Sequence, residues 1–184
     1  GIEKGVMTLV DEKRQRDILS SFAEGPNDFL RKCGGSVCNS IVAAGSLGSE
    51  TFFSGKVADD ADGHTFIREL AAAGVDFHNA QLETGVTGKC LVMVTVDAER
   101  TMNTFLGASA HLSKREIDET ALFNSQWLYI EGYLATSAEH TEMAMGIIRL
   151  AKASGVKVAI SLSDPFVVEA NSENLRQMVE VGVD

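Results

Sequence analysis

The carboxy-terminal third of the chain alternates between apolar runs short enough for strands and longer segments with the apolar spacing of amphipathic helices. The strands are predicted at 127–130 and 157–162, and the helices at 138–153 and from a cap at Asn171 or Ser172 to Val179. Strands and helices that alternate with short connections fold as parallel strands with right-handed crossovers. The pattern therefore predicts an α/β protein whose ligands bind beyond the carboxyl ends of the strands, here at 131–133 and 163–165.

The first two thirds of the chain are predicted to contribute shorter elements. These are a strand at 6–10, a helix at 12–22, a turn at 25–28, a strand at 51–57, a helix capped by Asp62 and closed by Gly74, and a short helix at 114–123. Residues 87–96 and 101–106 are predicted to form a hairpin around a turn at 97–100. Because apolar residues fall on both faces of the first hairpin strand, that strand is expected to be largely buried.

Composition limits the classes of partner. The 184 residues carry a net charge of −10 and no cluster of Lys or Arg, which argues against binding to nucleic acid or to anionic lipid. There is no run of about 18 apolar residues, so no membrane span is expected. The three cysteines lack CxxC spacing and the four histidines are scattered. This usage indicates packed, reduced thiols in a cytoplasmic protein and no metal site.

The stretch at 33–44 contains the strongest candidate for a ligand site. Gly34 and Gly35 have no Cβ, so another molecule can approach their backbone closely. Ser36 is predicted to cap a helix whose first turn offers unpaired N–H groups and a positive dipole end. The amide of Asn39 both donates and accepts hydrogen bonds, which suits the hydroxyl groups of a sugar ring.

Two alternatives apply to the same stretch. The glycines could form an ordinary turn before a helix that packs through Cys38, Ile41 and Val42. Alternatively, the helix start could lower the thiol pKa of Cys38 and make it a nucleophile, although the sequence supplies no obvious base beside it.

Arg100 is a second candidate. It is predicted to lie in the hairpin turn, where a guanidinium held over a ligand could bind a phosphate through two hydrogen bonds. The alternative is an exposed turn arginine without a ligand.

Several ordered blocks together resemble the ribokinase-like (PfkB-type) carbohydrate and nucleoside kinases, from about residue 30 onward. The blocks at 34–40, 47–48, 53–63 and 73–75 resemble the amino-terminal signature of that family. The blocks at 87–90, 99–102, 106–109, 129–133 and 162–166 resemble its adenosine-kinase-like branch.

The resemblance implies a three-layer α/β/α domain with a parallel sheet and a small β lid over the sugar site. The 184 residues would be most of one such domain, with lid strands within 1–12 and 84–108. The family transfers the γ-phosphoryl group of ATP, with magnesium, to a primary hydroxyl of a nucleoside or a sugar. The substrate is a small molecule, and adenosine or a similar nucleoside is expected on account of the apolar lid.

The same resemblance assigns roles to particular residues. Gly34, Gly35 and Asn39 would bind ribose-like hydroxyl groups, and Arg100 would lie near the transferred phosphoryl group. The base or sugar pocket would be lined by Met102, Thr104, Tyr133 and Leu134.

Other segments of the family pattern are not in this sequence. The family's substrate-binding Asp would precede residue 1, and its magnesium motif, anion hole and catalytic Asp would follow residue 184. The chain is therefore expected to be truncated at both ends, without the ATP-binding part, and it nominates no catalytic base and no metal ligand. Asp59, Asp60 and Asp62 are expected to cap and turn into a helix.

Two other readings remain open. The protein could be a binding module or regulator that keeps the sugar pocket without catalysis. It could also act as a homodimer through the β lid, which is compatible with either function.

Overall fold

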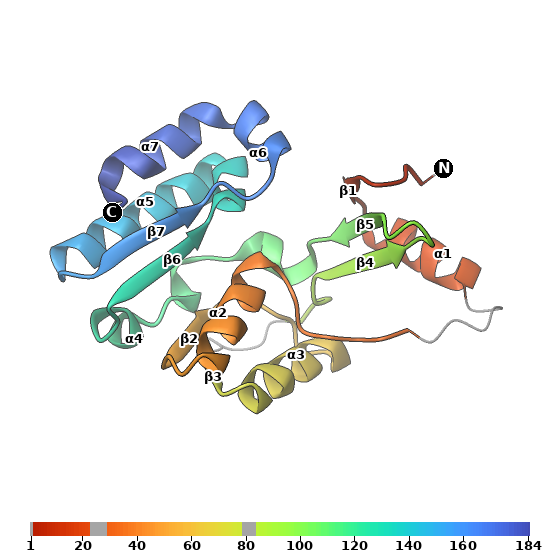
Figure 1. Ribbon diagram of the computed structural model, residues 1–184, viewed down its shortest axis with the longest axis horizontal. Coiled ribbons are helices and arrows are strands. Elements are labelled where there is room, and N and C mark those ends of the chain that lie inside the picture. The colour runs from red at the N-terminus through yellow and green to blue at the C-terminus, as the bar shows by residue number, and fades with distance from the viewer. Residues whose placement is uncertain (1, 23–28, 79–83) are drawn as a thin grey trace. The chain divides into compact units, whose positions relative to one another are not determined.

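The computed structural model describes residues 2–22, 29–78 and 84–184, and it contains two compact units (Figure 1). The hairpin unit is formed by residues 1–32, 56–67 and 81–111. The α/β unit is formed by residues 33–55, 68–80 and 112–184. The turn predicted at 25–28 lies outside the described residues.

The α/β unit contains the predicted parallel strands. β6 (Trp127–Glu131) and β7 (Lys157–Ser161) pair in parallel, with Ile130 opposite Ile160. The connection between them is the 3₁₀ helix η3 (Gly132–Thr136) followed by α5 (Ala138–Ala153). α6 (Pro165–Ala170) and α7 (Ser172–Gly182) follow β7. The parallel pairing and the bounds of α5 confirm the prediction for this part of the chain.

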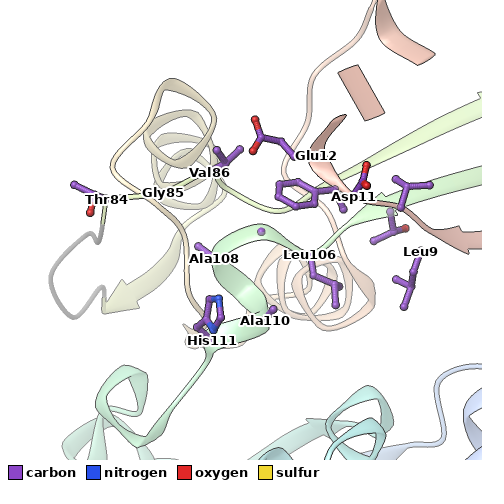
Figure 2. A pocket seen from close by; sticks show the side chains of 14 residues that line it. Leu9, Asp11, Glu12, Thr84, Gly85, Val86, Leu106, Ala108, Ala110 and His111 are labelled. Carbon is purple, nitrogen blue, oxygen red and sulfur yellow. The ribbon is translucent and has the colours of Figure 1, made fainter. Parts of the chain in front are cut away.

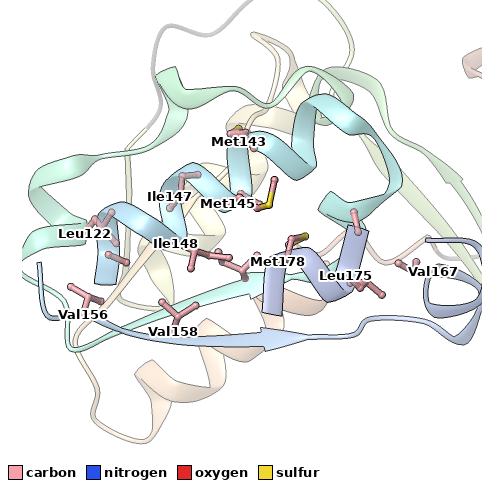
Figure 3. Close-up of a cluster of buried hydrophobic side chains, with 14 residues drawn as sticks. Leu122, Met143, Met145, Ile147, Ile148, Val156, Val158, Val167, Leu175 and Met178 are labelled. Carbon is pink, nitrogen blue, oxygen red and sulfur yellow. The ribbon is translucent and has the colours of Figure 1, made fainter. Parts of the chain in front are cut away.

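The core of this unit lies between α5, α7 and the two strands (Figure 3). The predicted apolar face of α5 is buried, because Met143, Ile147, Ile148 and Ala151 all belong to the core. Val158 and Met178 are fully buried. The complete cluster is Leu122, Ile130, Ala135, Met143, Ala144, Met145, Ile147, Ile148, Ala151, Val156, Val158, Val167, Leu175 and Met178.

A second parallel pair in the α/β unit joins β2 (Thr51–Ser54) to β3 (Val75–His78), with α3 (Ala61–Ala72) between them in the chain. α2 (Ser36–Ser46) contacts both strands, and Gly48 follows it with a φ of 97°. The helix predicted at 114–123 is instead two pieces, η2 (Lys114–Glu116) and α4 (Glu119–Phe123). The break occurs because the carboxylate of Asp118 accepts from the N–H of Ala121 and begins a new helix.

The hairpin unit contains a three-stranded sheet in the order β1 (Met7–Leu9), β5 (Arg100–Phe105) and β4 (Lys89–Val94). β4 and β5 are antiparallel, as the predicted hairpin requires, and β1 is parallel to β5. The predicted helix at 12–22 is α1 (Glu12–Phe22), which packs against β5 through buried residues that include Gln15 and Ile18. The 3₁₀ helix η1 (Gly107–His111) follows β5.

Two expectations for the hairpin are wrong. β4 is not buried on both faces, since Val92 and Val94 are 47% and 67% exposed. Arg100 is not in the turn, because it is the first residue of β5 and pairs with Val94. The turn lies earlier than predicted, at residues 95–99 between the two strands, and Ala98 adopts a φ of 65° within it.

The cap of α3 also differs from the prediction. α3 begins at Ala61, and the carboxylate of Asp60 accepts from the N–H of Gly63 at 2.7 Å. Asp62 instead forms an ion pair with Lys89 at 2.8 Å. The acidic run therefore does turn into a helix, with Asp60 rather than Asp62 as its cap. In the described part of the chain, no helix is long and apolar enough to cross a bilayer.

Candidate functional site

The glycine turn before α2 is open. Gly35 has a φ of 108° and a ψ of 151°, a backbone conformation that essentially only glycine adopts. A Cβ added to either Gly34 or Gly35 would meet no atom within 4 Å. Both backbones are therefore accessible to another molecule.

Ser36 does not cap α2, contrary to the prediction. The N-cap position is Gly35, which has no side chain, and Ser36 is the first helical residue. The hydroxyl of Ser36 instead donates a hydrogen bond to Oε1 of Glu131 at the carboxyl end of β6. This bond joins the glycine turn to the edge of the parallel sheet where ligands were expected to bind.

Asn39 and Cys38 have opposite environments on α2. Asn39 is exposed, and its side-chain amide forms no hydrogen bond with the described residues. Cys38 is 1% exposed, so the packing alternative is correct for Cys38 while Asn39 remains accessible. Burial raises the pKa of the Cys38 thiol to about 12, which contradicts a lowered thiol pKa and excludes a reactive thiolate at neutral pH.

The carboxyl ends of β6 and β7 meet beside η3. Gly132 is required there, because a Cβ would lie 2.6 Å from the carbonyl oxygen of Ser161. The N–H of Tyr133 donates to the hydroxyl of Ser163 at 3.2 Å, and Ser163 has a φ of 70°. Tyr133 and Leu134 are half-buried and pack against the core of the α/β unit.

The three predicted site residues of the hairpin unit share one face of its sheet. Arg100, Met102 and Thr104 alternate along β5, and α1 covers the opposite face, where Asn103 is buried. The guanidinium of Arg100 is exposed and has no ion-pair partner among the described residues. A free guanidinium of this kind can bind an anionic group.

Sequence reasoning missed two residues on the same face, Cys90 and Leu9. The hydroxyl of Thr104 donates to Sγ of Cys90 at 3.3 Å, and Leu9 pairs with Thr104 from the other side. The period-two alternation of β4 was a signal for Cys90, because it places this residue on the face of Val92 and Val94.

A pocket of about 540 Å³ lies at the end of this sheet (Figure 2). Its walls are mostly apolar, with Asp11 and Glu12 on one side and His111 on the other. Thr104 is the predicted site residue that lines it. The full lining is Leu9, Val10, Asp11, Glu12, Thr84, Gly85, Val86, Thr104, Phe105, Leu106, Gly107, Ala108, Ala110 and His111.

The predicted site residues thus form two groups. Gly34, Gly35, Asn39, Tyr133 and Leu134 belong to the α/β unit, and Arg100, Met102 and Thr104 belong to the hairpin unit.

The acidic residues before and within α3 have structural partners. Asp59 pairs with His64 at 2.9 Å, and the carboxylate of Asp60 accepts from the N–H and the hydroxyl of Thr87. Across residues 2–22, 29–78 and 84–184, no group of three or more His, Cys, Asp or Glu side chains is arranged to hold a metal ion.

The chain is similar to known proteins in both its sequence and its fold. The profile of the pfkB family carbohydrate kinases matches residues 15–181. The chain belongs to this family. The resemblance in the sequence is therefore confirmed.

Relatives of this PfkB family chain include sugar kinases and adenosine kinases. The chain is 29% identical over 138 residues to 5-dehydro-2-deoxygluconokinase of Halalkalibacterium halodurans, covering 73% of this chain and 42% of the relative. Among solved structures it is similar to adenosine kinase from Sinorhizobium meliloti, with 35% identity and a TM-score of 0.89, covering 100% of this chain and 56% of that one. A probable sugar kinase from Rhizobium etli gives 31% identity and a TM-score of 0.89, with 100% and 55% covered.

The fold of this PfkB family chain is therefore ribokinase-like. The chain spans about half the length of the relatives that it matches.

Proposed function

We propose that the complete protein is a cytoplasmic kinase that transfers the γ-phosphoryl group of ATP, with magnesium, to a primary hydroxyl of a nucleoside similar to adenosine or of a sugar. The observation that carries this proposal is the open glycine turn with its exposed Asn39, joined by Ser36 to the carboxyl end of β6. This is the edge at which parallel α/β sheets bind ligands. Membership of a carbohydrate kinase family supports the reaction class.

Each predicted residue has a role in this proposal. The backbone of Gly34 and Gly35 and the amide of Asn39 bind substrate hydroxyl groups, since an amide can donate and accept at once. The exposed guanidinium of Arg100 offsets the negative charge that develops on the transferred phosphoryl group. When bound, ATP would supply that group, and magnesium would neutralise charge on its phosphate oxygens. Arg100 suits a phosphoryl group, and the residues that the structure describes offer no ligand set for the metal.

We assign the hairpin unit as the lid of the substrate site. Its uncovered sheet face presents Met102, Thr104, Cys90 and Leu9, and the pocket beside it is mostly apolar. Tyr133 and Leu134, which belong to the α/β unit, are the other residues that the family resemblance assigns to the base or sugar pocket. An apolar wall suits a flat base better than a free sugar, and this favours a nucleoside. The sequence relatives named 5-dehydro-2-deoxygluconokinase keep a sugar derivative as the competing substrate class.

The experiment is ADP release by the complete protein with ATP and magnesium. The substrates are adenosine, inosine, ribose, fructose and 5-dehydro-2-deoxygluconate. Turnover of a nucleoside supports the proposal in full, and turnover of sugars alone overturns the nucleoside preference. Tight binding without turnover of any substrate favours the non-catalytic binding module.

Two substitutions test the residue roles in that assay. Asn39→Ala is expected to raise KM, because the amide binds a ground-state hydroxyl group. Arg100→Ala is expected to lower kcat, because its interaction develops in the transition state. Ser46→Ala, at the last residue of α2, is the matched control. An unchanged KM for Asn39→Ala, or an unchanged kcat for Arg100→Ala, removes that residue from the site.

The same uncovered sheet face could pair with a second copy of the chain. Val92 and Val94 are exposed on this face, and exposed apolar residues that lie together are typical of protein–protein contact sites. Light scattering of the complete protein decides this, and a strict monomer excludes a dimer through the lid.

A further inference from the structure

Glu131 is a carboxyl group in the site to which the proposed function gives no role. It is the last residue of β6, and its Oε1 accepts a hydrogen bond from the hydroxyl of Ser36, the first residue of α2. Ser36 and Glu131 are 95 positions apart in the sequence, and both belong to the α/β unit. The bond therefore connects the start of α2 to the carboxyl end of β6.

The surroundings of Glu131 contain few charges. Burial raises the pKa of its carboxyl group, and the hydrogen bond from Ser36 opposes that rise. α2 carries no charged side chain, and the titratable side chain of η3 is Tyr133. On β7, Lys157 lies opposite Trp127 at the far end. Beyond β7, the carboxylate of Asp164 accepts from the N–H of Phe166 as the cap of α6. Within the described residues, the side chain of Glu131 accepts its hydrogen bond from Ser36, and the Glu131 carboxyl group forms no ion pair with a cationic side chain.

The glycine turn depends on contacts at its two ends. Gly35 has no side chain with which to cap α2, and its φ of 108° has no local side chain to hold it. On one side of the turn, the N–H of Cys33 donates to the carboxylate of Glu69. On the other side, Ser36 donates to Glu131. Asn39 lies one helical turn beyond Ser36, and its N–H donates to the carbonyl of Gly35. Movement of the turn would therefore move Asn39.

We propose that Glu131 is a positioning residue that, as a carboxylate, holds the glycine turn and Asn39 in place through Ser36. This inference rests on the proposed function, because it assigns the turn to substrate binding. A carboxylate accepts a stronger hydrogen bond from a hydroxyl than a neutral carboxylic acid does. The positive end of the α2 dipole also favours the ionised form. Glu131 acts on the substrate only through Ser36, so it affects binding rather than the chemical step.

The proposal makes substrate binding depend on pH. Because the carboxyl pKa of Glu131 is raised, a larger share of this group is protonated in mildly acidic solution than for an ordinary Glu. Protonation weakens the bond to Ser36, so KM should rise as pH falls through that pKa, while kcat changes less. Glu131→Gln keeps an acceptor of the same shape but cannot ionise, so it removes this pH dependence.

The test is steady-state kinetics of the complete protein from about pH 5 to about pH 8, on the best substrate of the panel. Glu131→Gln and Ser36→Ala are each expected to raise KM at neutral pH by about tenfold, with kcat within about twofold of the unmodified protein. The double variant should be no worse than Ser36→Ala alone, because both substitutions act on the same contact and Ser36→Ala already removes its donor. Ser46→Ala, on the same helix, should change nothing.

Amide hydrogen exchange of the first turn of α2 gives a second measurement that does not need activity. Exchange at Val37 to Asn39 should be faster in Glu131→Gln and in Ser36→Ala than in Ser46→Ala. If no substrate is turned over, the proposed function fails while exchange still tests the contact. Unchanged KM and unchanged exchange in both variants overturn the positioning role, as does a pH dependence of KM that survives in Glu131→Gln. Ser36 is exposed, so its variant supports the test even if Glu131→Gln does not fold.

Discussion

Neighbouring glycines in the turn before α2 have different requirements. Gly35 has a φ of 108°, whereas Gly34 has no left-handed φ, and a Cβ would meet open space at both. The difference between them is therefore one of backbone conformation and not of packing.

Alanine substitutions separate these two requirements. Gly35→Ala should lower the free energy of unfolding by about 1–3 kcal/mol, because its backbone conformation is essentially restricted to glycine. Gly34→Ala should leave that free energy unchanged or raise it by up to about 1 kcal/mol, because alanine restricts the unfolded chain. Urea unfolding of the two variants measures the difference. Equal losses would mean that the turn does not hold Gly35 in this conformation.

The three cysteines should differ in reactivity. Cys90 is exposed, Cys33 is half-buried, and the buried Cys38 has its pKa raised from 9.0 to about 12. At about pH 8, iodoacetamide should modify Cys90 first and Cys38 only after unfolding, because the thiolate is the reactive form. The thiol of Cys38 ionises at a lower pH in the unfolded chain than in the folded one. Its ionisation should therefore lower the free energy of unfolding as pH rises from 9.0 towards about 12. Mass spectrometry of the labelled peptides checks the order, and early labelling of Cys38 would contradict its burial.

At the scale of elements, the sequence predicted the bounds of helices α1 and α5 better than the burial of strand β4. The bounds of α1 and α5 agree with the prediction, because apolar spacing is a local property of the helix itself. The burial of β4 was wrong, because a strand cannot reveal which of its faces another segment will cover. α1 covers the face of Leu91, and the face of Val92 stays open.

The same limit applies to the candidate site. The glycines and Asn39 were recognisable because their chemistry is local to the turn. The cap expected at Ser36 was wrong because its hydroxyl finds Glu131, which is distant in the sequence. No local pattern could have shown this partner.

The open face of β4 gives a prediction for the strand. Leu91 lies opposite the buried Asn103, whereas Val94 is 67% exposed and lies opposite Arg100. Leu91→Thr should therefore lower the free energy of unfolding by about 1–2 kcal/mol, from lost apolar burial. Val94→Thr should change it by less than about 0.5 kcal/mol. Chemical denaturation of both variants is the measurement, and a large loss for Val94→Thr would show that its face is covered in solution.

At the scale of the whole molecule, the two units differ in what they bury. The α/β unit has the continuous apolar cluster around α5 and α7. The buried side chains of the hairpin unit include the polar residues Gln15, Thr87, Thr101 and Asn103. Nδ2 of Asn103 has no hydrogen-bond partner in the described structure. A buried polar group without a partner is costly, so the hairpin unit should open at a lower free energy than the α/β unit.

Native-state hydrogen exchange tests this difference in local stability. The amides of α5, β6 and β7 should exchange more slowly than those of β4, because exchange there requires opening of the apolar core. Ile148→Ala should reduce the protection of α5 and β7 by about 2–5 kcal/mol, since Ile148 is fully buried. The protection of β4 should change little if the hairpin unit opens independently. The opposite outcome is that the amides of α5, β6, β7 and β4 are equally protected and that their protection falls together in Ile148→Ala. This would show that the two units unfold as one cooperative structure.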